Sequence, residues 1–126
     1  MKEYLNKIFE TPQKASADIV AGGNIIWHVF HYELVLLSDY SAIIYKIISE
    51  NNGIKKGSKT ILFEGHYNSP RNGYYSFELK LNNNQISKYW CCQITEDEKL
   101  ICHGYWWYNN SDEKHLETEL FGINEK

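Results

Sequence analysis

The sequence contains no apolar run long enough to cross a bilayer, which takes about 20 residues in a helix. Its opening residues, MKEYLNKIFETPQ, also lack the apolar stretch of a secretory signal peptide. These two absences predict a cytoplasmic protein with no membrane contact. No low-complexity segment, linker or fixed-period repeat interrupts the 126 residues. The chain is therefore expected to form one domain, 1–126.

Cysteine is scarce and odd in number, with residues at positions 91, 92 and 102. An odd count with two adjacent cysteines fits reduced thiols better than a secreted disulfide framework. The spacing matches no common zinc-ligand pattern. His28 and His31 lie three apart on an expected strand, so their side chains point to opposite faces. We therefore predict no metal site, and nothing in the sequence indicates a cofactor.

Familiar catalytic motifs are also missing: the chain has no Gly-rich phosphate loop, no G-x-S-x-G and no paired-carboxylate motif. In the expected sheet only His103 stands near another reactive group, Cys92, across a hairpin. A cysteine and a histidine could act as nucleophile and base, but no third orienting group is visible. A buried cysteine is more often a small apolar residue. His103 and Cys92 are therefore weak catalytic candidates, and whether the protein is an enzyme stays open.

Basic residues are sparse at the C-terminal end. Residues 96–126 hold eight acidic and three basic side chains, whereas residues 46–95 hold seven basic and three acidic ones, with a net charge of −3 overall. General nucleic-acid binding needs an extended basic surface, so it is not expected. A patch for one small anion, such as the phosphate of a nucleotide-like ligand, stays open. Its candidate residues are Lys55, Lys56, Lys59 and Arg71.

Aromatic residues, by contrast, are abundant at 15%, with ten tyrosines, four tryptophans and five phenylalanines. Tyrosine and tryptophan combine an apolar ring with a polar tip, so they suit the wall of a partly hydrated cavity better than a dry core. The densest run is ICHGYWWYNN, residues 101–110. Whether this run packs a core or lines a binding site depends on the strand register around it.

Strand patterns dominate from residue 23 onward, where β-branched and aromatic residues alternate with polar ones. The clearest unit is a hairpin over residues 74–94, whose two-residue turn at Asn83-Asn84 places Phe77 opposite Trp90. Tyr75 and Cys92 fall on the same inner face. A last strand is expected over residues 115–123.

Two segments are less uniform. Before residue 22, the spacing of Leu5, Ile8 and Phe9, together with Thr11-Pro12 and Gly22-Gly23, predicts two short helices. Residues 38–53 fit either a helix or a strand, and their β-branched content favours the strand.

The turn at Glu96-Asp97-Glu98 decides which residues of the aromatic run face inward. A two-residue turn at Asp97-Glu98 sets Cys92 opposite His103 and Trp90 opposite Tyr105. Trp107 then also points inward, and Trp106 and Tyr108 point out. A shift of the strand register by one residue exchanges the inward and outward sets, so the register stays open. The alternation of inward and outward residues favours the pairing of Cys92 with His103.

A meander of this length usually closes on itself to remove its edges. Together with the Gly-aromatic starts Gly73-Tyr74-Tyr75 and Gly104-Tyr105-Trp106, the strand order resembles the small up-and-down barrels of the lipocalin or calycin type over roughly residues 23–123. We therefore predict a mainly β protein: a single antiparallel barrel or strongly curved sheet of about seven to eight strands at 23–123, with helices in 1–22.

Eight-stranded barrels either fill with side chains or hold one small ligand. Seven or eight bulky, polar-tipped residues are hard to satisfy in a dry interior, which favours a wet cavity for a planar or aromatic ligand, with an anionic one included. The expected ligand-binding residues are Tyr67, Tyr75, Trp90, His103, Tyr105 and Trp107, with His28 and Tyr32 as further candidates. A packed core, a barrel enzyme of isomerase or cyclase type and a protein-interaction module are the alternatives. A homo-oligomer stays open.

Overall fold

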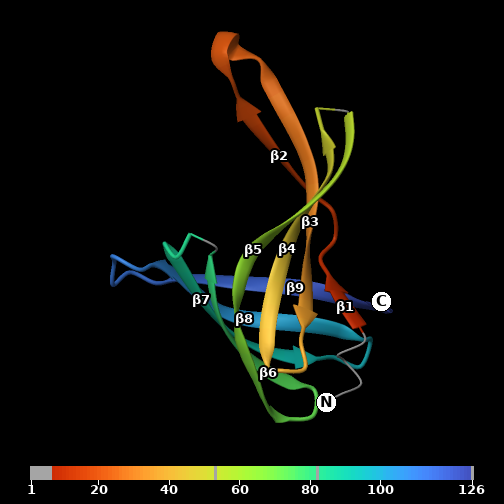
Figure 1. Cartoon of the computed structure of the whole chain (residues 1–126), viewed down its shortest axis with the longest axis vertical. Helices are drawn as coiled ribbons and strands as arrows, with labels where there is room; N and C mark the ends of the chain where they lie inside the picture. Colours follow the sequence, from red (N-terminus) through yellow and green to blue (C-terminus); the bar gives the residue numbers. More distant parts are fainter. Residues whose placement is uncertain (1–6, 53, 82, 126) are drawn as a thin grey trace.

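The computed structural model describes residues 7–52, 54–81 and 83–125, and it is almost entirely β. Eight antiparallel strands, β1 and β3 to β9, close into a barrel, because β1 pairs with β9 on one side and with β3 on the other (Figure 1). The strands are β1 (Lys7–Glu10), β2 (Lys14–Ile19), β3 (Ile25–Leu36), β4 (Ser41–Asn51), β5 (Ile54–Arg71), β6 (Tyr74–Leu81), β7 (Ile86–Ile94), β8 (Lys99–Tyr108) and β9 (His115–Glu125). In the described part, no helix is long and apolar enough to span a membrane. The predicted barrel is confirmed.

The N-terminal segment is extended, so the prediction of two short helices in 1–22 is wrong for the described residues, and residues 1–6 lie outside them. The segment pairs with β3 as β1 and β2, separated at Pro12, which has no N–H to give to the ladder. Thr11 bridges this break: its N–H donates to Tyr32 O, and its Oγ1 accepts from Tyr32 N–H, both at 3.0 Å. Pairing with a distant strand overrides the local helical spacing. A three-residue 3-10 helix at Ala21–Gly23 is the helical element here.

The predicted strands in the central part of the chain are present. Residues 41–51 form β4, which confirms the strand in the ambiguous segment. Phe77 lies opposite Trp90, which confirms the hairpin of β6 and β7. Apolar side chains from all eight barrel strands fill the interior, and the largest of the fully buried ones are Phe9, Phe77, Phe121, Leu34, Leu79 and Leu100.

The connection between β7 and β8 is a three-residue loop, Glu96 to Glu98, where the sequence analysis expected a two-residue turn. The Thr95 N–H donates to Lys99 O at 2.8 Å and closes the loop. Glu98 adopts a left-handed backbone conformation with φ of 58°. This is the residue that ends a three-residue hairpin loop, a position that more often holds glycine or asparagine.

The longer loop moves the register of β8 by one residue. Cys92 pairs with Cys102, and Trp90 pairs with Gly104. The predicted pairings of Cys92 with His103 and of Trp90 with Tyr105 are therefore wrong. Because side chains alternate between faces, the shift moves a whole set to the outside of the barrel. The residues moved are His103, Tyr105 and Trp107.

Two glycines allow neighbouring strands to approach unusually closely. A Cβ at Gly65 would lie 1.9 Å from Glu78 O, and a Cβ at Gly104 would lie 1.9 Å from Tyr89 O. No side chain fits at either position. The two glycines let β5 coil against β6 and β8 against β7, and this strong coiling supports closure of the barrel.

Beyond the barrel, the strands β2 to β5 continue into a projection that we call the arm, formed by β2, the first half of β3, and the ends of β4 and β5 around residues 47–59 (Figure 1). β5 spans 18 residues, pairing with β4 from Ile54 to His66 and with β6 from Phe63 to Arg71. Several large apolar side chains on the arm are exposed, including Trp27, which is 55% accessible. Barrel and arm therefore share continuous strands.

Candidate functional site

The six residues expected to bind a ligand divide between the two faces of the barrel wall. Tyr67, Tyr75 and Trp90 are buried in the interior. The other three, His103, Tyr105 and Trp107, lie on the outer face because of the register of β8. The structure therefore does not bring the six into one cavity.

Inside the barrel, an aromatic cluster occupies the end next to the turn between β3 and β4. The ring of Tyr67 lies 6.0 Å from that of Tyr75 and 6.1 Å from that of Phe77. The hydroxyl of Tyr67 donates to Leu37 O at 3.1 Å, which satisfies its polar tip within a packed core. Burial, followed by the nearby Tyr40 and Asp39, raises the pKa of Tyr67, so the phenol stays protonated at neutral pH. These rings pack the core.

The other part of the interior holds a small polar pocket of about 130 Å³. Lys88 Nζ lies 3.0 Å from Glu117 Oε1, and the indole N–H of Trp90 donates to the same oxygen at 2.7 Å. Tyr32 also lines this pocket, and its pKa is raised by burial, then by the charges of Glu119 and Glu117. Drug-sized ligands usually need roughly 300 Å³ or more. The pocket suits a few waters better than a planar molecule.

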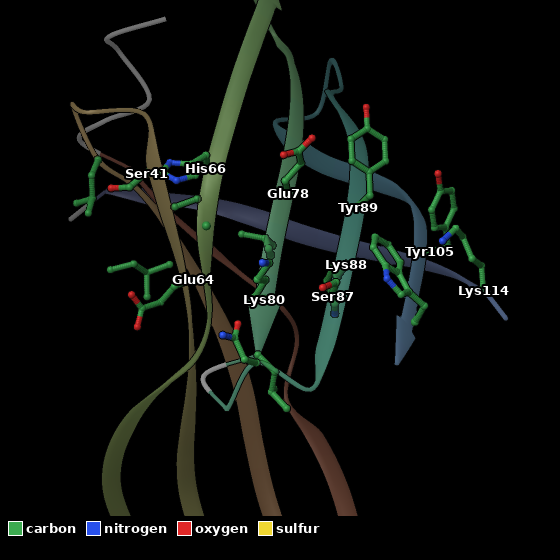
Figure 2. A pocket seen from close by; sticks show the side chains of 18 residues that line it. Ser41, Glu64, His66, Glu78, Lys80, Ser87, Lys88, Tyr89, Tyr105 and Lys114 are labelled. Carbon is green, nitrogen blue, oxygen red and sulfur yellow. The ribbon is translucent and has the colours of Figure 1, made fainter. Parts of the chain in front are cut away.

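A larger hollow lies on the outside, where a groove of about 1070 Å³ crosses strands β4 to β8 (Figure 2). Strand register builds it from two rows of cross-strand partners, which we call the outer rows. The first row contains Ser41, His66, Glu78, Tyr89 and Tyr105. The second row contains Ile43, Glu64, Lys80, Ser87 and Trp107. This outer groove contains two of the six predicted residues.

One wall of the outer groove is aromatic. The ring of Tyr105 lies 6.1 Å from that of Tyr89 and 5.8 Å from that of Trp107. Lys114 Nζ lies 4.1 Å from the centre of the Trp107 ring and 5.6 Å from that of Tyr105. All three rings are half-buried, with faces left for contact. The planes of Tyr89 and Tyr105 are tilted by 38°, and those of Tyr105 and Trp107 by 47°, so the wall offers separate ring faces beside one positive charge.

The opposite side of the groove is polar and carries both charge signs. Glu64 stands opposite Lys80, and His66 opposite Glu78, on β5 and β6. Figure 2 shows His66 and Glu64 on one side of the groove, and Tyr89 and Tyr105 on the other.

Tyr89 is the polar group at the boundary between the two sides. Its oxygen lies 3.7 Å from the sulfur of Cys91. This contact, and to a lesser extent the charge of Glu78, raises the pKa of Tyr89. At neutral pH the phenol is therefore protonated and can donate a hydrogen bond to an acceptor in the groove.

The two catalytic candidates are separated by the barrel wall. Cys92 is buried in the interior, whereas His103 is exposed on the outer face, where its Nδ1 lies 3.4 Å from Thr118 Oγ1. Burial raises the pKa of Cys102, the cross-strand partner of Cys92, well above the usual range of a thiol. The predicted Cys–His pair does not form, and two of its premises, the register and the shared face, are wrong.

The expected phosphate contacts are also dispersed. Lys59 Nζ lies 3.2 Å from Glu33 Oε1, and the guanidinium of Arg71 lies 4.3 Å from the centre of the Tyr74 ring. Neither residue lines the outer groove. The side chains of Lys55 and Lys56 lie outside the described part of the structure. His28 is on the arm, 2.9 Å from Asp18, and not in the interior.

Sequence reasoning missed most of the outer groove. Tyr89, Glu78 and Lys114 carried no motif, and Glu78 was simply an outward position of its strand. Their signal is the register itself: once Lys80 faces Ser87 and Ser87 faces Trp107, the rows follow. No family model, curated protein or solved structure was found to match the chain. The function is therefore argued from this geometry alone.

Proposed function

We propose that the protein binds a small planar molecule with an anionic substituent in the outer groove. The observation that carries the proposal is the consecutive ring series of Tyr89, Tyr105 and Trp107, with Lys114 beside it. Flat rings favour stacking of a flat ligand, and a stacked base or ring contributes about 1–3 kcal/mol per aromatic residue in comparable sites. The size of the groove, about 1070 Å³, admits a ligand of nucleotide size.

Lys114 accounts for the preference for an anion. Its ammonium lies over the ring of Trp107, the surface on which a ligand ring would stack. Lys114 is exposed and sits on the loop between β8 and β9, so it can move aside and remain next to the ligand. Lys80 adds a second positive charge from β6. The acidic residues Glu64 and Glu78 on the far side would disfavour a ligand with a negative charge at both ends.

The proposal is tested by native mass spectrometry of the protein purified from its own host, which would reveal a co-purified small molecule. A direct binding measurement uses 1-anilinonaphthalene-8-sulfonate, a planar aromatic anion, in a fluorescence titration. Trp107→Ala should weaken binding about tenfold, because it removes a stacking face. Lys114→Ala should also weaken binding, and it should make the remaining affinity less dependent on salt.

Trp27→Ala is the matched control, because Trp27 is an exposed tryptophan of the arm, paired with β2, and does not line the groove. It should bind the probe like the unmodified protein. Equal loss in Trp27→Ala and Trp107→Ala would mean that the probe reads general surface hydrophobicity, and unchanged binding in Trp107→Ala would reject the outer groove as the site.

A further inference from the structure

A second cluster of chemically capable side chains lies on the outer face where β1 pairs with β3, away from the outer groove. Glu10 is the direct cross-strand partner of Glu33, and His31 precedes Glu33 by two residues on the same face of β3. One ligand atom from each of the three lies within 4.8 Å of the other two. Two strands therefore bring one imidazole nitrogen and two carboxylates together.

The charge balance at this cluster is unusual for a strand pair. Like charges directly opposite each other destabilise an antiparallel ladder. Glu33 is only 9% exposed, and its Oε1 accepts no hydrogen bond within the described residues. Lys59 Nζ, 3.2 Å from that oxygen, supplies one positive charge against two carboxylates. This ion pair therefore compensates the two carboxylates only in part, at a place that is partly accessible to water.

Outer contacts hold the three side chains in position. The amide nitrogen of Gln13 lies 3.4 Å from His31 Nδ1, and the Gln13 Oε1 accepts from Ser49 Oγ at 3.4 Å. His31 Nε2 points toward Glu33 Oε2 at 3.6 Å. Asn124 Nδ2 donates to Glu10 Oε2 at 3.0 Å. Turning the Gln13 amide gives up the contact with Ser49, places the amide oxygen at Nδ1–H and leaves the imidazole Nε2 unprotonated toward the carboxylates. Hydrogen bonds of this kind, made to the ligating side chains by neighbouring residues, orient the ligands in metal sites.

We propose that Glu10, His31 and Glu33 form a binding site for a divalent transition-metal ion, with Zn²⁺ as the best match. Zinc takes nitrogen and carboxylate-oxygen ligands at about 2.0–2.2 Å, and three protein ligands leave a fourth position for water. Tetrahedral ligands at that distance lie roughly 3.3 Å apart. The side chains must therefore close in from their present separation, as the cation replaces their repulsion with attraction.

Lys59 competes with the metal for Glu33. Its side chain is 48% exposed, so its ion pair is weak and easily displaced. Lys59 Nζ also lies 4.4 Å from the centre of the Tyr45 ring, which gives the ammonium an alternative contact when it leaves the carboxylate. The proposal therefore makes Lys59 an antagonist of metal binding, which a merely structural ion-pair network would not do.

The site would act on barrel closure. β1 has four residues, and it contacts β3 through two pairs, Phe9 with Leu34 and Glu10 with Glu33. A cation shared by Glu10 and β3 joins the two strands at the point where the barrel closes. Metal binding should therefore stabilise the whole fold, because a ligand that binds the folded state alone raises the unfolding temperature.

The test is isothermal titration calorimetry of the full chain with ZnCl₂, together with thermal unfolding with and without the metal. We expect one Zn²⁺ per chain and a higher unfolding temperature with metal. His31→Ala and Glu10→Gln should each weaken binding by about tenfold or more, and Lys59→Ala should strengthen it about threefold. Circular dichroism without metal checks that each variant is folded, and Glu10→Gln, which keeps the shape of the side chain, serves if His31→Ala does not fold.

Two matched controls identify binding elsewhere. His103→Ala removes an exposed histidine outside the cluster, and Cys91→Ser removes an exposed thiol. Neither substitution should change the affinity for Zn²⁺. Loss of binding in Cys91→Ser or His103→Ala would overturn the proposal, as would unchanged binding in Glu10→Gln or weaker binding in Lys59→Ala. These results are independent of the outer groove, whose own probe does not use a metal.

Discussion

Cys92 and Cys102 are direct cross-strand partners on β7 and β8, and both side chains are buried in the barrel interior at 4% and 0% exposure. The side chain of Cys91 points to the opposite side of the barrel wall from those of its neighbours Trp90 and Cys92. It is exposed on the outer face. The three thiols therefore fall into two chemical classes, although two of them are adjacent in the sequence.

Thiol accessibility provides the first prediction. Burial raises the pKa of Cys102, so its reactive thiolate is scarce at neutral pH. We expect Ellman's reagent to label one thiol per native chain quickly, and all three after denaturation. Cys91→Ser should abolish the fast reaction. Fast labelling of two or three thiols in the native protein would contradict the β7–β8 register.

Stability should fall at alkaline pH. Burial raises the pKa of Cys102 above its ordinary value of 9.0, and it raises the pKa values of Tyr32 and Tyr67 above 10.0. A group whose pKa is higher in the folded state contributes stability that is fully present below its unfolded pKa and is lost as the pH rises. The free energy of unfolding, measured in urea, should therefore decrease from about pH 9 upward.

The control for this pH dependence replaces one thiol at a time. Cys102→Val removes a buried titrating group, so the decline between about pH 9 and pH 10 should become shallower. Cys91→Ser changes an exposed thiol and should leave the slope as it is. A stability profile that stays level to pH 11 would show that these groups titrate alike in the folded and unfolded chain.

Close strand contact at Gly104 should make this position intolerant of any side chain. Gly104→Ala places a Cβ 1.9 Å from Tyr89 O, so the strands must separate, and we expect a loss of at least about 2 kcal/mol of unfolding free energy. Gly57→Ala is the matched control, since nothing lies within 4 Å of its Cβ position. It should change stability by less than about 1 kcal/mol. Similar effects of the two substitutions in urea denaturation would argue against the close approach.

Trp90 and Trp107 should respond in opposite ways to truncation. Trp90 is 2% exposed and donates to Glu117, so Trp90→Ala should cost about 3–5 kcal/mol of stability. Trp107 is on the outer face, and Trp107→Ala should cost about 1 kcal/mol or less. Guanidinium unfolding curves of the two variants measure the difference. A larger loss of unfolding free energy in Trp107→Ala than in Trp90→Ala would indicate that Trp107 is buried in the barrel interior.

The sequence predicted the architecture better than the site, and the reason is local. In the hairpin around Asn83-Asn84, turn length and alternation agree, so the pairing of Phe77 with Trp90 was derived correctly. At the next hairpin, Glu98 adopts a left-handed backbone conformation. This conformation is uncommon for glutamate, so the residue type does not predict it. One extra loop residue was enough to exchange the faces of β8.

The N-terminal error has a different origin. The spacing of Ile8 and Phe9 is compatible with a helix, and the strand results from pairing with residues more than 20 positions away, such as Leu34. Such pairing is not visible in a local pattern. The outer rows share this property, because each row joins residues from five strands. Their composition follows from the strand register, which depends on the length of every turn between the five strands.

β5 begins in the arm at Ile54 and continues into the barrel, where Glu64, Gly65 and His66 line the outer groove. The residues from Ile54 to Glu64 extend over roughly 35 Å at about 3.3 Å per residue, and the pairing of β5 with β4 shifts register twice along this stretch. β4 lies alongside it over most of this length, from Asn51 in the arm to Ser41 at the groove. β4 and β5 therefore build both the arm and one side of the outer groove, so the arm is not a separable appendage of the barrel.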